Sequence, residues 1–420
     1  MALYSGFHKL TLEERIKFLM QHVGLEANEA QALLNSGSLD MQVADRWIEN
    51  VVGSIHLPLG LATNFKINGH ELMVPMAIEE PSVVAAACRA AKQTLPDGFK
   101  ADADDPVMIG QIQLIDVLDI KSAIKKIETN KKEILGVADT FVSSHLGKFG
   151  GGVRDLAIKV VTTNRQKLLV IEFYVDVRDA MGANMINTLL EGITPTIVGY
   201  TGGKNRLRII SNLATKRKVR ASAIWKKEVV GEEIIDGVLD AYEFANADIY
   251  RCCTHNKGIM NGIDAVVLAT GNDWRAVEAG AHAYASIKGY HSLTTYKKTE
   301  KGDLEGSIEL PLAVATVGGA VNTSPTAKIA LKIMGVKTSQ ELAMVCACVG
   351  LANNFAALSA LATVGIQQGH MKLHARNVAI RAGAESTEEI DLVAAKLSEE
   401  KDFTTDKARS ILERFRKGGS

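Results

Sequence analysis

Cysteine is scarce in this chain of 420 residues, and its placement excludes a disulfide framework. The number of cysteines is odd, and each lies in apolar surroundings: Cys88, Cys252, Cys253, Cys346 and Cys348. Neither the adjacent pair nor the C-x-C pair is accompanied by a second ligand pair, so we expect no metal site. Reduced cysteines in apolar segments are typical of a cytoplasmic protein, and we expect that location.

Long apolar runs and an excess of charge of either sign are also absent. Lys+Arg and Asp+Glu both total 48, and this balance argues against capture of nucleic acid or of an anionic membrane surface. No stretch approaches the roughly 20 uninterrupted apolar residues of a membrane span, and the first residues lack the apolar core of a signal peptide. We therefore expect neither a membrane nor a nucleic acid as partner.

The common nucleotide-binding motifs are missing as well. No G-x-G-x-x-G follows a predicted strand, and GYTGGKN (199–205) fails the P-loop pattern in its spacing and in its final residue. The glycine-rich GKFGGGVRD (147–155) leads into a strand, whereas a Rossmann turn opens a helix. A dinucleotide would therefore have to bind in an unusual way.

The middle of the chain has the element order of a ferredoxin-like domain. Its apolar pattern predicts strand, helix, strand, strand, helix and strand. The segments are VMIGQIQLIDV (107–117), a helix at 119–137, VRDLAIKVVTT (153–163), KLLVIEFYVDV (167–177), the helix DAMGANMINTLLEGI (179–193) and RLRIISNLA (206–214). We take 108–215 to be a small domain inserted into a larger one.

Alanine-rich helices dominate the rest, which makes the whole chain α+β. We expect helices at 41–52, 231–246, 273–288, 324–334 and 338–364, and strands at 264–269 and 307–313. The large domain then comprises 1–107 and 216–375. A helical appendage, 376–420, follows glycine-containing joints that leave room for hinge motion.

Four positions attract attention chemically, although each has a structural explanation. Glu80 opens a helix and can stabilise its dipole. Lys257 lies in THNKGIMNG, where we expect a glycine-flanked loop, and it can be a surface lysine. Asp273 can be a helix N-cap, and His370, like His374, can be a satisfied histidine. Together, however, these residue types suit chemistry at a carbonyl group. A lysine can stabilise an oxyanion, carboxylates can share a proton, and a histidine can protonate a leaving group.

Five motifs resemble one family, the 3-hydroxy-3-methylglutaryl-coenzyme A reductases of the soluble class found in bacteria and archaea. They are EEPSVVAAA (79–87), GGGVRD (150–155), DAMGANMIN (179–187), YRCCTHNKGIMNGIDAVVLATGNDWRAVEAGAHA (250–283) and LANNFAALSALATVGIQQGHMKLHARN (351–377). The resemblance implies reduction of hydroxymethylglutaryl-CoA to mevalonate and free coenzyme A by two NAD(P)H, through a hemithioacetal and mevaldehyde. It implies a large substrate domain, a cofactor domain at 108–215 and a C-terminal flap.

The resemblance also assigns roles to residues. Lys257 would stabilise the oxyanion, Glu80 would donate a proton in the aldehyde step, Asp273 would lie between these two, and His370 would protonate the coenzyme A thiolate; His374 does not match that role. Substrate-binding roles fall to Ser82, Arg251, Asn261 and Asn212. Cofactor-binding roles fall to Asp179, Met181, Gly182, Asn184 and Met185, where Asp179 can also be only a helix cap.

The cofactor prediction depends on 143–152, SSHLGKFGGG. Family members that use NADH resemble each other in having an aspartate shortly before the glycines, placed to bind the adenosine ribose. This chain has no acid there. A carboxylate would repel a 2′-phosphate, whereas the positions present here, Ser143, Ser144, His145 and Lys148, would accept one. We therefore predict NADPH, with NADH possible.

The resemblance further implies a homodimer with the active site at the subunit interface. Three alternatives remain open at this point. The same enzyme could run in reverse and degrade mevalonate. A non-redox coenzyme A thioester enzyme could use Lys257 and Asp273 without a nicotinamide. A non-catalytic helical module would have only caps and surface charges at these positions.

Overall fold

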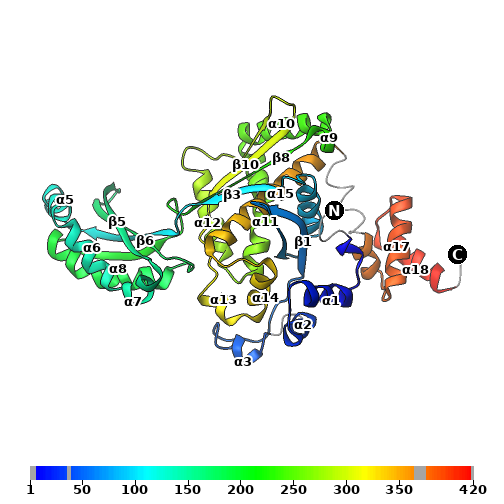
Figure 1. Ribbon diagram of the computed structural model, residues 1–420, viewed down its shortest axis with the longest axis horizontal. Coiled ribbons are helices and arrows are strands. Elements are labelled where there is room, and N and C mark those ends of the chain that lie inside the picture. Colours follow the sequence, from blue (N-terminus) through cyan, green and yellow to red (C-terminus); the bar gives the residue numbers. More distant parts are fainter. Residues whose placement is uncertain (1–5, 36–38, 364–374, 418–420) are drawn as a thin grey trace.

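The computed structural model describes residues 6–35, 39–363 and 375–417. Two sheets organise the chain (Figure 1). The large sheet has the strand order β2-β1-β3-β8-β10-β9, and its neighbours are antiparallel except for β1 and β3. Its strands are β1 (Leu59–Ile67), β2 (His70–Ala77), β3 (Phe99–Ala103), β8 (Lys218–Trp225), β9 (Thr294–Lys298) and β10 (Leu304–Pro311).

The small sheet lies in the inserted segment and has the order β5-β6-β4-β7, antiparallel throughout. Its elements are β4 (Val107–Ile115), α5 (Ile120–Thr129), α6 (Lys131–Thr140), α7 (Ser143–Leu146), η2 (Gly147–Phe149), β5 (Gly152–Thr162), β6 (Lys167–Asp176), α8 (Ala183–Thr201) and β7 (Lys204–Ser211). The helices cover one face and form a core of their own with it. The predicted α+β class with an inserted split-βαβ unit is confirmed.

Helices surround the large sheet. They are η1 (Phe7–Lys9), α1 (Leu12–His22), α2 (Ala27–Leu34), α3 (Met41–Ala44), α4 (Val83–Lys92), α9 (Lys227–Val230), α10 (Glu232–Ala247), α11 (Ile249–Ala269), α12 (Trp274–Ala285), α13 (Gly319–Thr323), α14 (Pro325–Met334) and α15 (Ser339–Leu361). Helix α15 packs on β3, β8 and β10 and also contacts α4, α10 and α11. The approach of α11 to α15 requires glycine, because a Cβ at Gly262 would come 2.9 Å from the carbonyl oxygen of Val349.

Helix α15 is apolar on all sides because it is a core helix. Among the described residues it is the one helix long and apolar enough to cross a membrane by length and composition, but 89% of its apolar window is buried within the protein. The indole of Trp225 stacks on Phe355 of this helix, with ring centroids 4.0 Å apart. A helix that is hydrophobic all round fits such a buried position.

Three local predictions were wrong, and the single helix expected at 119–137 is divided at Asn130 into α5 and α6. Residues 264–269 do not form a strand, and Lys257 does not lie in a loop, because both belong to the continuous helix α11. A short apolar run of valine, leucine and alanine cannot be assigned to helix or strand from periodicity alone, and the buried contact with α15 decides in favour of the helix. The helix expected at 41–52 is limited to Met41–Ala44.

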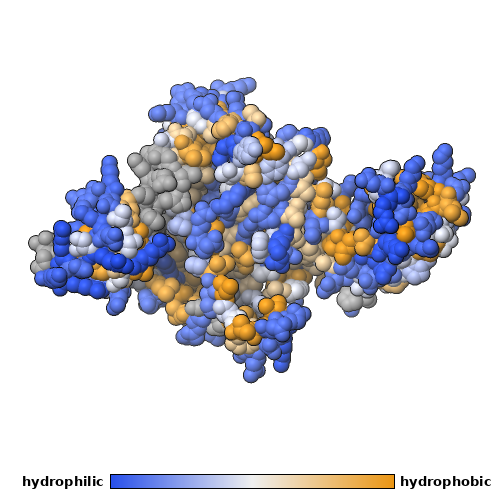
Figure 2. All heavy atoms as spheres, turned by 180° about the vertical axis from the view of Figure 1, so that it is seen from behind, coloured by the Kyte–Doolittle hydropathy of each residue, from blue (hydrophilic) through white to orange (hydrophobic). Residues whose placement is uncertain are grey.

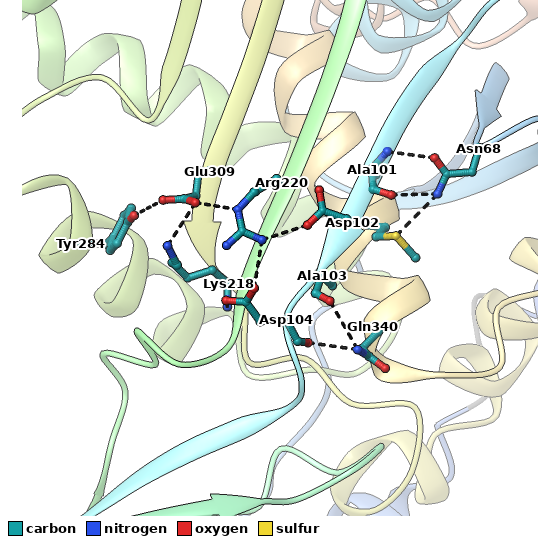
Figure 3. A network of polar contacts seen from close by, with 11 residues as sticks. Asn68, Ala101, Asp102, Ala103, Asp104, Lys218, Arg220, Tyr284, Glu309 and Gln340 are labelled. Atoms are coloured by element: carbon teal, nitrogen blue, oxygen red, sulfur yellow. Dashed lines mark hydrogen bonds and ion pairs between the residues drawn. The ribbon is translucent and has the colours of Figure 1, made fainter. Parts of the chain in front are cut away.

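A polar network within the large part lies where the chain enters and leaves the inserted unit (Figure 3). The guanidinium of Arg220 donates to Asp102, Asp104 and Glu309 at 2.8–2.9 Å, and the amide of Gln340 donates to the carbonyl oxygen of Asp104 at 3.0 Å. On the returning strand, the buried Arg217 donates to the carbonyl oxygens of Ala180 and Val314. The bond from Arg217 to Ala180 links the two parts directly, and the Arg220 and Gln340 bonds fix the strands of the large sheet from which the chain enters and leaves the inserted unit.

The C-terminal helices form a separate small core. Helices α17 (Thr387–Glu400) and α18 (Thr405–Arg416) pack on each other and on the helical stretch 375–381. The guanidinium of Arg416 pairs with the Glu389 carboxylate at 2.7 Å. Figure 1 shows these helices at the opposite end of the molecule from the inserted unit.

A buried histidine holds α11 against the segment that leads into β9. His255 Nε2 lies 2.8 Å from the hydroxyls of both Thr294 and Ser292. The Thr294 hydroxyl donates onward to Asn354, so the Nε2–H of His255 is the donor to Thr294. Its Nδ1 is buried without a hydrogen-bond partner in the described part of the chain. Burial, together with the nearby charge of Arg251, lowers the pKa of His255 to about 4.

This histidine makes folding stability depend on pH. The pKa of His255 in the folded protein lies below the ordinary 6.5. The contribution of the neutral imidazole to folding stability is therefore complete above pH 6.5 and is lost as the pH falls towards 4. Between pH 7 and pH 4.5, the wild type should lose about 2–3 kcal/mol more unfolding free energy than His255→Gln. Urea unfolding at the two pH values measures this difference. The exposed His70→Gln variant should follow the wild type, and equal pH dependence of His255→Gln and wild type would refute the assignment.

Candidate active site

Three predicted residues meet around one carboxylate oxygen. Glu80 lies in the turn between β2 and α4, and Lys257 and Asn261 lie one turn apart on α11. The Lys257 ammonium is 2.8 Å from Glu80 Oε2, and the Asn261 amide donates to the same oxygen at 3.2 Å. The side chains of Lys257 and Glu80 are 59% and 35% exposed. The ion pair is therefore formed in advance and is accessible to a substrate.

The turn that carries Glu80 contains a strained residue. Ser82 has a φ of 75°, in the left-handed region, and its side chain does not cap the helix that follows. Such a conformation in a residue other than glycine costs about 1–3 kcal/mol and is concentrated at functional sites. The strain directs the chain sharply from β2 into α4, which leaves Glu80 pointing towards α11.

Arg251 lies in the first turn of α11, whose N-cap Asp248 accepts a hydrogen bond from the Arg251 backbone N–H at 2.8 Å. Its side chain is half-buried and has no hydrogen bond or ion pair to any described residue. Six residues separate it from Lys257, about 9 Å along the helix axis. Its charge nevertheless acts nearby, since it contributes to the lowered pKa of His255.

Asp273 and Asn212 lie elsewhere. Asp273 caps α12 by accepting from the Ala276 N–H at 3.1 Å, and its carboxylate is 3.7 Å from the Arg275 guanidinium. The neighbouring Asn272 N–H bonds to the carbonyl oxygen of Val267, ten residues after Lys257 and so about 15 Å further along α11. Asn212 lies against α12, where a Cβ at Gly280 would come 2.7 Å from its carbonyl oxygen. One chain therefore brings Glu80, Lys257 and Asn261 together but not Asp273 or Asn212.

His370 and His374 lie outside the described residues. Among the residues that the structure describes, no group of three or more His, Cys, Asp or Glu side chains could hold a metal ion.

The segment Asp179–Met185 lies where the inserted unit meets the large part. Asp179 Oδ1 accepts from the backbone N–H of Ser339, the first residue of α15, at 2.8 Å, and it does not cap the nearer α8. Gly182 precedes α8 with a φ of 95°, and a Cβ there would come 2.5 Å from the Val177 side chain. No side chain caps α8 and no acid lies in its first turn, which leaves the amides of that turn available. Asn184 is exposed and Met185 packs on the inserted unit's core.

Residues 143–152 form α7, η2 and the glycine turn before β5. Ser143 and Lys148 are exposed, and the side chains of Ser144 and His145 are outside the described set. Sequence reasoning missed two arginines here. Arg154 and Arg178 both donate to the Gly150 carbonyl oxygen at 2.6 Å and both pair with the buried Asp176, at 2.7 and 3.1 Å. Arg154 stands in GGGVRD and could have been noticed, whereas nothing in the sequence indicates the left-handed φ of 53° at Arg178.

The arrangement as a whole offers a lysine ammonium beside a carboxylate, a cation without a partner among the described residues, and a free helix N-terminus next to a cationic glycine turn. A lysine beside a carboxylate can polarise a carbonyl oxygen and deliver a proton to it. A free helix N-terminus can bind an anion such as a pyrophosphate.

Comparisons with known proteins agree with this chemistry. The family model described as hydroxymethylglutaryl-coenzyme A reductase matches residues 11–375. The 3-hydroxy-3-methylglutaryl-coenzyme A reductase of Archaeoglobus fulgidus is 52% identical over 98% of this chain and 94% of its own length. A probable reductase of the same name from Borreliella burgdorferi is 35% identical over 90% of this chain and 87% of its own.

A solved structure is similar along nearly the whole chain. The class II 3-hydroxy-3-methylglutaryl-CoA reductase from Streptococcus pneumoniae, bound to NADPH in open conformations, has a TM-score of 0.81 and 40% identity over 97% of this chain and all of that one. The motifs, the fold and these relatives agree, and the chain belongs to the hydroxymethylglutaryl-coenzyme A reductase family.

Proposed function

We propose that this protein reduces hydroxymethylglutaryl-CoA to mevalonate and free coenzyme A with two NADPH, in the cytoplasm and in the direction of isoprenoid biosynthesis. The reaction takes four electrons, because a thioester becomes an alcohol by way of a hemithioacetal and mevaldehyde. NADPH, when bound, supplies the hydride for each reduction. The observation that carries the proposal is the single Glu80 oxygen shared by Lys257 and Asn261.

Lys257 stabilises the oxygen that becomes negative. An ammonium has three N–H bonds, and the pairing with Glu80 uses one of them. The others can donate to the thioester carbonyl oxygen and then to the hemithioacetal oxyanion, where a fixed donor is most effective. When the hemithioacetal collapses, the thiolate leaves, and we assign its protonation to His370.

Glu80 delivers the proton in the second reduction. Both of its contacts use Oε2, which leaves Oε1 as the oxygen that can hold a proton and pass it to the mevaldehyde oxygen. The Asn261 amide fixes the plane of the carboxyl group. Arg251 offers the substrate carboxylate a guanidinium that has no partner among the described residues, and Ser82 offers a hydroxyl on the Glu80 turn that does not cap α4.

We assign Asp273 and Asn212 to the site of a second copy of the chain, in a homodimer. Within one chain, Asp273 follows the far end of α11, about 15 Å along the helix axis from Lys257, and so does not lie between Lys257 and Glu80. Large apolar side chains are also exposed: Ile249 and Tyr250, beside Arg251, are 63% and 83% exposed, and Val52 and Ile55 are 100% and 96% exposed. Apolar patches interrupt the polar surface in Figure 2. Exposed apolar surface of this kind is typical of protein interfaces.

We assign cofactor binding to the inserted domain, 108–215, and substrate binding to the large domain, 1–107 and 216–375. The free first turn of α8 suits the pyrophosphate. Ser143, Lys148 and the absence of an acid before Gly150 suit the 2′-phosphate, and Arg154 and Arg178 add positive charge beside that turn. Residues 376–420 serve as the flap that closes over the bound substrate and excludes water.

Removal of the lysine tests the chemistry. Lys257→Ala should lower kcat at least about 100-fold, the loss typical of an oxyanion-stabilising donor, in an assay that follows NADPH absorbance with hydroxymethylglutaryl-CoA. Lys301→Ala, in the exposed turn between β9 and β10, is the matched control and should retain wild-type turnover. A folded Lys257→Ala variant with kcat close to wild type would exclude this role.

Mixing two inactive variants tests the shared site. Lys257→Ala and Asp273→Ala are each expected to be inactive, but a heterodimer has one intact site if Asp273 acts across the interface. Refolding an equal mixture should restore about a quarter of wild-type activity, because half of the dimers are mixed and each has one working site. Continued inactivity of a mixture shown to contain heterodimers would place all the residues in one subunit.

Steady-state kinetics with NADPH and with NADH test the predicted preference for NADPH. We expect kcat/KM to be higher for NADPH than for NADH. Lys148→Glu should lower the value for NADPH roughly tenfold more than the value for NADH, since a carboxylate repels a 2′-phosphate. Lys126→Glu, on α5, should change neither value. A higher kcat/KM for NADH in the wild type would contradict the assignment.

A further inference from the structure

A chain of four polar side chains connects α11 to α12 behind the proposed active site. Asp264 belongs to α11, Glu278 and His282 belong to α12, and Tyr290 follows that helix. His282 Nε2 lies 2.8 Å from Glu278 Oε2, and His282 Nδ1 lies 2.8 Å from the Tyr290 hydroxyl. The carboxyl groups of Asp264 and Glu278 are within hydrogen-bonding reach of each other. The Tyr290 hydroxyl also interacts with the Asn256 amide, next to Lys257.

Two carboxyl groups can form a hydrogen bond only if one of them carries a proton. Burial, reinforced by Glu278, raises the pKa of Asp264 to about 8, while the contact with His282 lowers the pKa of Glu278. At neutral pH, Asp264 is therefore the acid that donates and Glu278 the carboxylate that accepts. Asp264 Oδ1 has no partner in the described part of the chain, and an unpaired buried oxygen costs less on a neutral acid than on a carboxylate.

Few other groups affect this proton. Among the described residues, the titratable or charged groups that face Asp264 are Glu278 of α12 and the buried thiol of Cys346 on α15, whose pKa is raised by burial and by Asp264. His282 and Tyr290 act on Asp264 only through Glu278. None of these partners is a cation in direct contact with Asp264, so the ionised acid would face a second negative charge without compensation.

The position of the pair connects it to the proposed reaction. Asp264 follows Lys257 by seven residues, almost two full turns, and so lies on the same face of α11. Glu278 follows Asp273 by five residues on α12. We propose that Asp264 and Glu278, joined by one shared proton, are positioning residues that fix the helix carrying Asp273 against the helix carrying Lys257. The inference rests on the proposed reductase function.

Loss of the shared proton at alkaline pH should therefore impair the reaction. Two facing carboxylates repel each other, α12 shifts against α11, and Asp273 leaves its place in the site. We expect kcat to fall about tenfold between pH 7 and pH 9, one pH unit above the pKa of the acid. The KM for hydroxymethylglutaryl-CoA should change less, because Arg251 lies in the first turn of α11 and Ser82 lies in the turn before α4, so neither is on α12.

The test compares the pH profile of kcat in the wild type, Asp264→Asn and Glu278→Gln. Each substitution leaves at most one carboxylate, so the fall between pH 7 and pH 9 should shrink to less than about twofold. Asp240→Asn, which neutralises an exposed acid on α10, should keep the wild-type fall. An unchanged alkaline fall in both variants, or a wild-type kcat that is flat to pH 9, would overturn the proposal. Glu278→Gln also serves if Asp264→Asn does not fold.

Stability gives a second readout that does not need the reductase activity. The raised pKa means that the unfolded chain loses this proton near the ordinary value of 3.8, whereas the folded chain keeps it up to about 8. The contribution of Asp264 to stability is therefore fully present below pH 3.8 and declines as the pH rises to 8. The Tm of Asp264→Asn relative to wild type should rise across that window. A constant Tm difference would refute the shared proton even if the protein proved to have another activity.

Discussion

Lys257 can meet Glu80 because the packing of α11 fixes the direction in which the lysine side chain points. The two residues are 177 positions apart, so their contact depends on how one helix is fixed against three neighbours. Gly262 allows α11 to touch the backbone of α15, and the buried His255 ties its first half to Thr294 and Ser292. On the exposed side, the left-handed Ser82 turns the chain so that Glu80 faces the helix. The positions of Lys257 and Glu80 are therefore set by the packing of the core and by backbone contacts more than by the attraction between the two charges.

The same rigidity separates the remaining site residues. The packed helix α11 that fixes Lys257 also keeps Asp273 away from it. Asp273 follows the C-terminal end of α11, about 15 Å from Lys257 along the helix axis, and α12 cannot fold back across the buried face of α11 to reach Lys257. The missing group must therefore come from outside the chain if it acts on Lys257. In a dimer with two-fold symmetry, Asp273 of one subunit can lie beside Lys257 of the other, and the same contact is then formed a second time with the subunits exchanged. Such a dimer would complete both sites without any change in the fold of the chain.

Sequence reasoning succeeded where one local pattern decided the outcome. Alternating apolar residues predicted every strand of the inserted unit, including β5 (Gly152–Thr162) and β6 (Lys167–Asp176), because one face of that sheet is covered by helices. It failed at 264–269, where contact with α15 decides between helix and strand. The family resemblance supplied Glu80 and Lys257 as candidates, but periodicity could not show that they touch. Asp264 was overlooked because its unusual state depends on Glu278 and on burial, and neither is visible in a string of letters.

The junction of the inserted unit decides which part of the protein can move. Within the large part, Arg220 binds three carboxylates beside the points where the chain enters and leaves that unit (Figure 3). Between the two parts, the buried Arg217 donates to the Ala180 carbonyl oxygen, and Asp179 accepts from the Ser339 N–H. Opening the junction would break the bonds that cross it, and the loss of the Ala180 carbonyl oxygen would leave a donor of the buried Arg217 without its partner, which is costly. In the proposed function, this attachment would hold the cofactor at a constant position. The C-terminal helices pack on a core of their own, and in the proposed function this separate core would let them close over the substrate as one body and exclude water from hydride transfer.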